Sequence, residues 1–268
     1  MKSIADFEFN GAPLLNGIML VLKTVRPDFD REKAETHINE LIRQTRKRLP
    51  PHSDEQTCLQ TLITLFYHKW QFGGASGVYS LSDTLWLDNV LRTQRGSPVS
   101  LGILFLHIAQ AIGLPVVPVV FPTQLILRAD LDDDTLFINP INGDILDQHT
   151  LDVWIKGTVS PAHHLTGDDL EEAENSHVVR KYLDSIKVAL MEEKKMELAL
   201  KVSETILLFD PDDPYEIRDR GLIYAQLDCS HIAISDLNYF IEQCPQDPVS
   251  EMIKMQIHTY EQQHIVLH

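Results

Sequence analysis

Two serines stand three residues apart at the start of an apolar helix, within the stretch RGSPVSLGILFLHIAQAIGLP from Arg95 to Pro115. A serine hydroxyl becomes a nucleophile only when a general base accepts its proton. Ser97 and Ser100 are therefore candidate nucleophiles for hydrolysis or acyl transfer if a histidine lies within hydrogen-bond reach. His107 is on the same helix, roughly 10 to 15 Å further along at about 1.5 Å per residue, which is too far.

The other histidines stand in no motif for a base or a metal site. His149 and the pair His163 and His164 are predicted to lie in loops, and no H-E-x-x-H occurs. Cys58 fits a small buried side chain in a periodic helix better than a nucleophile. We therefore expect no metal and no cofactor. A hydrolase or acyl transferase with a serine or another unrecognised nucleophile remains the alternative function.

Strong local signals start the helix that carries the serines. Ser97 is a hydroxyl N-cap, and Pro98 occupies the first helical position, where a proline sacrifices no hydrogen bond. Upstream, apolar residues at helical spacing predict further helices, with Ser53 and Ser82 as N-caps of the last two. Their ranges are 14–25, 31–49, 53–70 and 81–91.

Downstream of this helix the hydrophobic period changes from helical to strand-like. Short runs rich in Val and Ile predict strands at Val116–Phe121, Leu125–Arg128 and Leu136–Ile138, and Asn142-Gly143-Asp144 is a hairpin turn by its chemistry. A helical region followed by an antiparallel meander is an α+β arrangement.

The C-terminal region repeats with a period of 34. The matched positions are Ala199 and Ala233, Pro211 and Pro245, and Pro214 and Pro248. This period is typical of tetratricopeptide repeats, in which two helices meet at a small residue and a proline stops the second helix. The sequence thus predicts an all-α repeat domain over residues 176–268, after a first domain over 1–165 and a polar boundary near 160–175.

The first helices of such repeats line a concave face that can bind a partner. On the helix that starts at Pro214, five side chains are predicted to face a ligand. They are Tyr215, Arg218, Leu222, Ala225 and Gln226. The alternative is that this face packs on the rest of the same chain.

Composition limits the partners. The chain of 268 residues has a formal net charge of −16, whereas a nucleic-acid binder needs a basic face. Its one basic cluster, Arg43–Arg48, is typical of a solvated helix end. The N-terminus MKSIADFEFN is unlike a signal peptide, no apolar run reaches the roughly 18 residues of a membrane span, and three widely spaced cysteines fit a reducing compartment. We expect a cytoplasmic protein with protein or peptide partners, and neither nucleic acid nor membrane.

The order of these parts resembles that of the bacterial SirB-type proteins, in which a transglutaminase-like domain is fused to tetratricopeptide repeats. The likeness covers the whole chain and is carried by SLSDTLWLD, FPTQLILR, PYEIRDRGLIYAQLDC and the terminal HIVLH, which are similar to gammaproteobacterial members. It implies a papain-like core in which a central helix packs on a small antiparallel sheet.

Active members of this superfamily place a cysteine in the first turn of such a helix, a histidine on the following strand and an aspartate on the next. The resemblance puts these positions at Val99 (Pro98 with a slip of one residue), at Gln124 in FPTQLILR and at Asn139 in FINP. Many members have FPGHFLLR and FIDP there, so this chain departs further from the catalytic pattern.

None of the three residues supports the chemistry. Val99 has no nucleophile, Gln124 cannot accept a proton near neutral pH, and Asn139 has no imidazole to orient. We therefore expect a protein that is not an enzyme and acts through protein–protein interaction, as a regulatory adaptor. The degenerate groove, formed by Ser97, Val99, Ser100, Gln124 and Asn139, could still bind an extended peptide through hydrogen bonds.

Overall fold

An apolar helix lies at the centre of one of two compact units, the unit of residues 8–182. The computed structural model describes residues 4, 7–77, 80–132 and 134–265, and in it α5 spans Pro98–Ala111. Its buried side chains lie on all sides of the helix: Val99, Leu101, Ile103, Leu104, Phe105, Leu106 and Ile108. A helix that is apolar all round needs cover all round. Helices α1, α2 and α4 and strands β3 and β4 provide that cover.

The N-terminal helices occur where the sequence predicts them, with two differences. They are α1 (Leu14–Val25), α2 (Arg31–Arg46), α3 (Glu55–Ile63) with a π-helix over Thr64–Lys69, and α4 (Leu87–Thr93). The N-cap of α3 is Asp54, not Ser53, because the Asp54 carboxylate accepts from Thr57 N at 2.7 Å and suits the positive end of the helix dipole. Ser82 starts only a 3-10 turn over Ser82–Thr84, and α4 begins later at Leu87.

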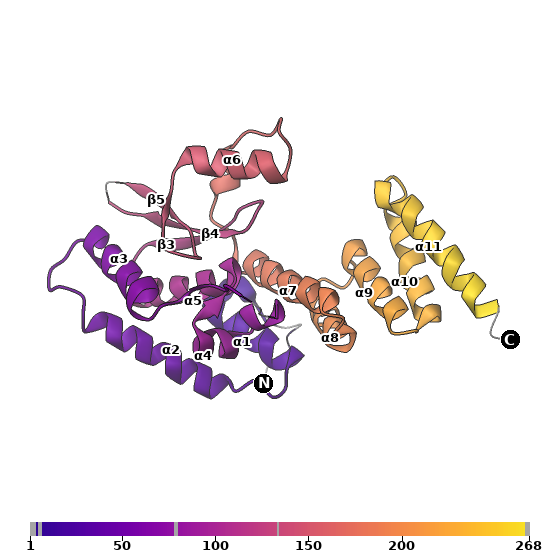
Figure 1. Cartoon of the computed structure of the whole chain (residues 1–268), viewed down its shortest axis with the longest axis horizontal. Coiled ribbons are helices and arrows are strands. Elements are labelled where there is room, and N and C mark those ends of the chain that lie inside the picture. Colours follow the sequence, from indigo (N-terminus) through magenta and orange to yellow (C-terminus); the bar gives the residue numbers. More distant parts are fainter. Residues whose placement is uncertain (1–3, 5–6, 78–79, 133, 266–268) are drawn as a thin grey trace. The chain divides into compact units, whose positions relative to one another are not determined.

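The predicted meander is confirmed as a four-stranded antiparallel sheet. Its strands, in spatial order, are β3 (Val116–Val120), β4 (Leu125–Asp130), β5 (Thr135–Ile138) and β6 (Ile145–Leu146). Helix α6 (Gln148–Thr158) lies across the sheet from α5 (Figure 1). Ile126 of β4 packs with Leu151 and Ile155 of α6, so the sheet separates two apolar layers.

Before α5, two short strands fix the chain. Strand β2 (Arg95–Gly96) pairs in parallel with β1 (Gly73–Gly74), and Ser97 follows directly. The first turn of α5 is therefore held by backbone pairing on one side and by the sheet on the other.

The C-terminal helices confirm the repeat. They are α7 (Asn175–Glu192), α8 (Met196–Leu207), α9 (Pro214–Gln226), α10 (Ser230–Gln243) and α11 (Pro248–Ile265). Helices α8 and α10 start 34 residues apart, and so do α9 and α11. Where α9 meets α10, a Cβ on Gly221 would lie 3.0 Å from Asp236 Cβ and 3.2 Å from Ala233 O, so the close approach requires a glycine.

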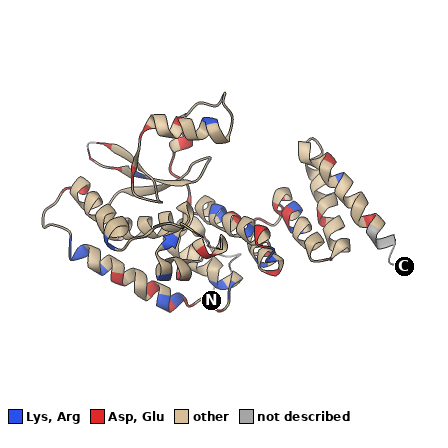
Figure 2. Ribbon diagram, in the orientation of Figure 1, with Lys and Arg blue, Asp and Glu red and all other residues tan. Residues whose placement is uncertain are grey.

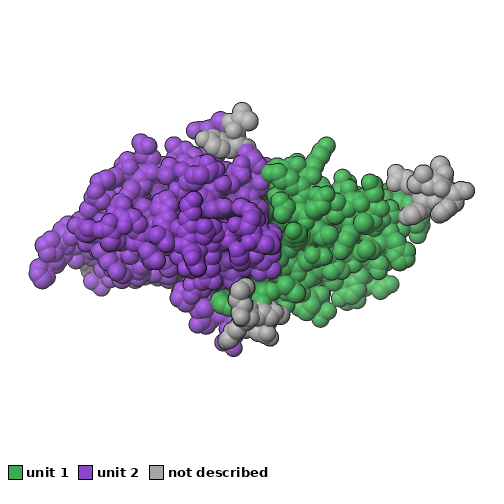
Figure 3. Space-filling model, turned by 90° about the horizontal axis from the view of Figure 1, so that it is seen from below, with its two compact units in different colours: residues 1–7, 183–268 green, residues 8–182 purple. Residues whose placement is uncertain are grey.

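The chain divides into two compact units, one of residues 8–182 and the other of residues 1–7 with 183–268 (Figure 3). The division falls within α7. The polar segment before α7 belongs to the unit of residues 8–182. Ala173 N donates there to Pro118 O at 2.8 Å, and Arg128 Nη1 donates to Leu170 O at 2.7 Å.

Candidate functional site

The two serines at the start of α5 are bonded to each other and to the backbone. Ser97 Oγ accepts from Ser100 N at 3.3 Å, and Ser100 Oγ accepts from Ser97 N at 3.0 Å, which is a reciprocal capping box. Ser100 Oγ also donates to Thr84 O at 2.6 Å. Ser100 is 0% exposed, and its single hydroxyl proton has a close acceptor within the fold.

Val99 lies in the first turn of α5, and the residues that follow Gln124 and Asn139 lie near the next turn of this helix. Val99 is 4% exposed. One turn further, a Cβ on Gly102 would lie 2.7 Å from Leu125 Cδ2 and 3.5 Å from Pro140 Cβ. Leu125 and Pro140, which directly follow Gln124 and Asn139, therefore lie near Gly102 of α5.

Asn139 uses its polar groups to shape a turn. Its Oδ1 accepts from Ile141 N at 3.0 Å, its N donates to Asp144 O at 2.9 Å, and its carbonyl accepts from Gly143 N at 2.8 Å. The buried Tyr67 hydroxyl donates to Pro140 O at 3.0 Å, and burial raises the pKa of this phenol far above its usual range. This end of β5 is thus a hydrogen-bonded turn.

Gln124 opens on a cavity of about 360 Å³ on the α6 side of the sheet. The lining residues are Thr123, Gln124, Val153, Trp154, Gly157 and Thr158. Among the described residues, the buried Thr123 Oγ1 has no hydrogen-bond partner. The cavity therefore offers an amide, which both donates and accepts, next to an indole, while the serines and Asn139 lie outside its lining.

The histidines that could serve as a base lie elsewhere. His149 lines a different cavity with Asp152, and His164 Nδ1 is 4.0 Å from Asp152 Oδ1. His163 Nε2 is 3.7 Å from Asp169 Oδ2. His107 is half-buried on α5, where burial lowers its pKa. Every hydrogen bond described for the two serine hydroxyls stays between these serines and the backbone of Thr84 and Ser97.

The predicted concave face of α9 is largely in contact with its own repeat. The Tyr215 hydroxyl donates to Asp247 Oδ2 at 3.0 Å, and the Arg218 guanidinium lies 5.3 Å from the Phe240 ring centroid. Leu222 packs on the cluster around Phe240. Of the remaining two residues, Ala225 is half-buried and Gln226 is exposed.

The unit that contains the repeats holds a buried ionic cluster that the sequence did not predict. Lys187 is 2% exposed, and its Nζ lies 2.6 Å from Glu216 Oε2 and 2.9 Å from Asp219 Oδ2. Ser203 Oγ donates to the other Glu216 oxygen at 2.6 Å. Burial lowers the pKa of Lys187, but the carboxylates of Glu216 and Asp219 outweigh it and hold the pKa above its usual value. The signal was a lysine where the 34-residue period puts Gly221.

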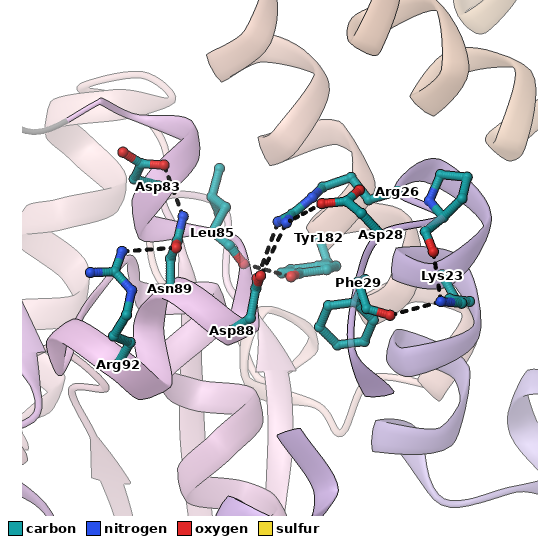
Figure 4. Close-up of polar contacts among 11 residues, drawn as sticks. Lys23, Arg26, Asp28, Phe29, Asp83, Leu85, Asp88, Asn89, Arg92 and Tyr182 are labelled. Carbon is teal, nitrogen blue, oxygen red and sulfur yellow. Dashed lines mark hydrogen bonds and ion pairs between the residues drawn. The ribbon is translucent and has the colours of Figure 1, made fainter. Parts of the chain in front are cut away.

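A second polar cluster supports the SLSDTLWLDNVL stretch (Figure 4). Arg26 donates to both Asp88 oxygens at 3.1 and 3.0 Å. The Tyr182 hydroxyl donates to Leu85 O at 2.6 Å, and burial raises the pKa of this phenol. Leu85 follows Thr84, so the cluster holds the turn whose carbonyl accepts from Ser100.

Neither a metal centre nor a membrane span is evident in the part of the chain that the structure describes. Over residues 7–77, 80–132 and 134–262, no three His, Cys, Asp or Glu side chains are grouped as ligands of a metal ion. None of the helices in the same residues combines the length and the apolar composition needed to cross a lipid bilayer.

Comparison with known proteins identifies both parts of the chain. The transglutaminase-like superfamily matches residues 32–184, and the tetratricopeptide repeat matches residues 186–258. Protein SirB1 of Salmonella typhimurium and the UPF0162 protein YchA of Escherichia coli K12 are each 52% identical over 269 residues, with 100% of both chains covered. A UPF0162 protein of Vibrio cholerae is 37% identical over 96% of each chain. No solved structure matches the chain. The chain therefore belongs to the gammaproteobacterial family of SirB1 and the UPF0162 proteins, in which a transglutaminase-like domain precedes tetratricopeptide repeats.

Proposed function

We propose that this protein is a non-catalytic member of the transglutaminase-like superfamily and acts as an adaptor that binds other proteins. One observation carries the proposal: Ser100 is fully buried, and its hydroxyl donates to Thr84 O at 2.6 Å. Acyl transfer needs an exposed nucleophile beside a proton acceptor. The resemblance assigns the superfamily's cysteine, histidine and aspartate positions to Val99, Gln124 and Asn139, none of which supports the chemistry.

The repeat unit supports the binding role. Stacked helical repeats present extended surfaces to proteins and peptides. The net charge of −16 favours partners with basic surfaces over nucleic acids. The cavity beside Gln124 offers a second place for a peptide, with an amide next to Trp154. The three free cysteines, of which Cys229 is exposed, support a reducing cytoplasmic setting.

Site-specific crosslinking tests this proposal. Gln226 is exposed at the end of α9, so a photo-crosslinking side chain there should capture a partner without disturbing the fold. We expect one reproducible adduct with a second protein in native cells. We expect none when the crosslinking side chain is placed at Leu81, an exposed position in the unit of residues 8–182. Turnover of an ester or amide substrate by the purified chain, with no adduct at Gln226, contradicts the proposal.

A further inference from the structure

The last helix of the repeat unit carries an exposed, uncharged stripe. Helix α11 buries Ile253 and Ile257 on one side. On the other side Met252 and Met255 are 57% and 66% exposed, the largest fractions among the exposed large hydrophobic side chains described. At about 100° per residue, Gln256 and Thr259 fall next to them. We call these four residues, Met252, Met255, Gln256 and Thr259, the methionine stripe.

The 34-residue period relates this stripe to a packing surface. It places Met255 at the position of Gly221 and Met252 at that of Arg218. On α9 these positions contact α10: a Cβ on Gly221 would lie 3.1 Å from Leu237 Cγ, and the Arg218 guanidinium is 5.3 Å from the Phe240 ring centroid. On α11 the equivalent side chains are open to solvent. The face that pairs with a helix in one repeat is thus unpaired in the next.

The C-terminal part of the sequence, which carries the stripe, is predominantly acidic. From residue 227 onward the sequence has six acidic residues, and Lys254 is the only Lys or Arg. Four of the six, Asp236, Glu242, Glu251 and Glu261, lie on α10 and α11, where Figure 2 shows red segments. Lys254 Nζ itself lies 2.6 Å from Glu251 Oε1, so its charge is already paired. Exposed methionines on a predominantly acidic part of the chain complement a helix that has an apolar face and basic flanks.

We propose that the methionine stripe docks an amphipathic, basic helix of a partner protein, in the place that α10 takes on α9. This inference rests on the proposed adaptor function and names its surface and the chemistry of its partner. Methionine side chains are flexible and polarizable, so they adapt to helices of different shape. A second copy of this chain would bring the same acidic surface to the stripe, and like charges oppose that pairing.

A designed peptide provides the probe. A fluorescent peptide of about 18 residues, with leucines on one helical face and lysines on the other, is titrated against the full chain and read by anisotropy. Its controls are a scrambled peptide and one with glutamate in place of lysine. We expect only the basic amphipathic peptide to bind, and the double variant Met252→Glu/Met255→Glu to weaken binding about tenfold or more.

The design separates apolar contact from charge. The double variant adds negative charge, which alone would strengthen a basic peptide, so weaker binding must come from the lost methionines. The matched control Leu208→Glu/Ile232→Glu changes two exposed apolar side chains of the same unit and should leave binding unchanged. The variant Glu251→Lys places a positive charge beside Met255 and should weaken both the binding and its salt dependence. This variant provides a second test if Met252→Glu/Met255→Glu unfolds at a lower temperature than the wild type.

Three results overturn the inference. The first is that the wild type, the methionine variant and the variant Glu251→Lys bind the basic peptide equally. The second is that the acidic peptide binds as tightly as the basic one. The third is a wild-type dimer in sedimentation velocity that Met252→Glu/Met255→Glu converts to a monomer. If the crosslink at Gln226 persists while peptide binding ignores the stripe, the inference fails and the adaptor function stands. If neither the crosslink at Gln226 nor the binding of the basic peptide is observed, both the adaptor function and the docking inference fail.

Discussion

At the start of α5 the polar side chains bond to one another and to nearby backbone, whereas on α11 two large apolar side chains remain open to solvent. A group whose bonds are used inside the fold contributes to stability, since removing it leaves its partners unsatisfied. An exposed apolar group contributes little until something covers it. The comparison therefore predicts that substitutions at buried polar groups change stability, and that substitutions on α11 change binding.

The largest effect should come from the buried ionic cluster of the repeat unit. Glu216→Ala leaves Lys187 buried without its closest carboxylate, and we expect the free energy of unfolding to fall by about 3–5 kcal/mol in urea titrations. The double variant Lys187→Met/Glu216→Leu should recover most of this loss, because it removes both fully buried charges while Asp219 keeps its ion pair with Arg218. A Glu216→Ala variant as stable as the wild type would mean that the cluster has no structural role.

Ser100→Ala should have the next largest effect. It removes the bond to Thr84 O and half of the capping box. Ser97 N still donates to Thr84 O at 3.0 Å, so we expect a loss of about 1–2 kcal/mol. Ser97→Ala should cost about 1 kcal/mol, as for an ordinary N-cap. Crosslinking from Gln226 should be unchanged in both variants. Full stability together with lost crosslinking would reverse the roles that we assign to the two regions.

His107 gives α5 a pH dependence of smaller size. Because burial lowers its pKa, the unfolded chain binds this proton at a higher pH than the folded chain does. Below the ordinary pKa of 6.5 the unfolded state therefore holds more protons, and stability falls as the pH falls. Between pH 7 and about 5.5, urea midpoints of His107→Gln should fall less than those of the wild type. Parallel curves would show that this histidine titrates alike in both states.

The smallest change in stability is expected on α11. Met252 and Met255 are exposed, so replacing both by glutamate should alter the free energy of unfolding by only about 0.5 kcal/mol. Unfolding curves in urea, with the same slope for variant and wild type, check this. A loss comparable to that of Ser100→Ala would show that the stripe already packs within the chain.

The sequence predicted the elements whose signals are local. Ser97 and Pro98 start α5 and Pro214 starts α9 as expected, and the 34-residue period recurs as the spacing between the starts of α8 and α10. Errors arose where neighbouring residues compete, as when Asp54 rather than Ser53 caps α3. The helix predicted over residues 81–91 also begins later than expected, at Leu87, after a 3-10 turn.

The polar clusters could not be predicted, because their partners are far apart in the chain. Lys187 and Glu216 are separated by 29 residues, and Arg26 and Asp88 by 62. No periodic pattern links such positions, and only the tertiary fold brings them together. For the same reason, the contact between Tyr215 and Asp247, which are 32 residues apart, could not be read from the sequence.

The most direct test of the central claim is intact mass spectrometry with peptide mapping after incubation with a fluorophosphonate and with an activated ester. The hydroxyl of Ser100 is buried and hydrogen-bonded, so the folded chain should gain no adduct at Ser97, at Ser100 or at any residue lining the Gln124 cavity. Stoichiometric labelling of one of these side chains, lost on unfolding, would establish an activated nucleophile and contradict the account.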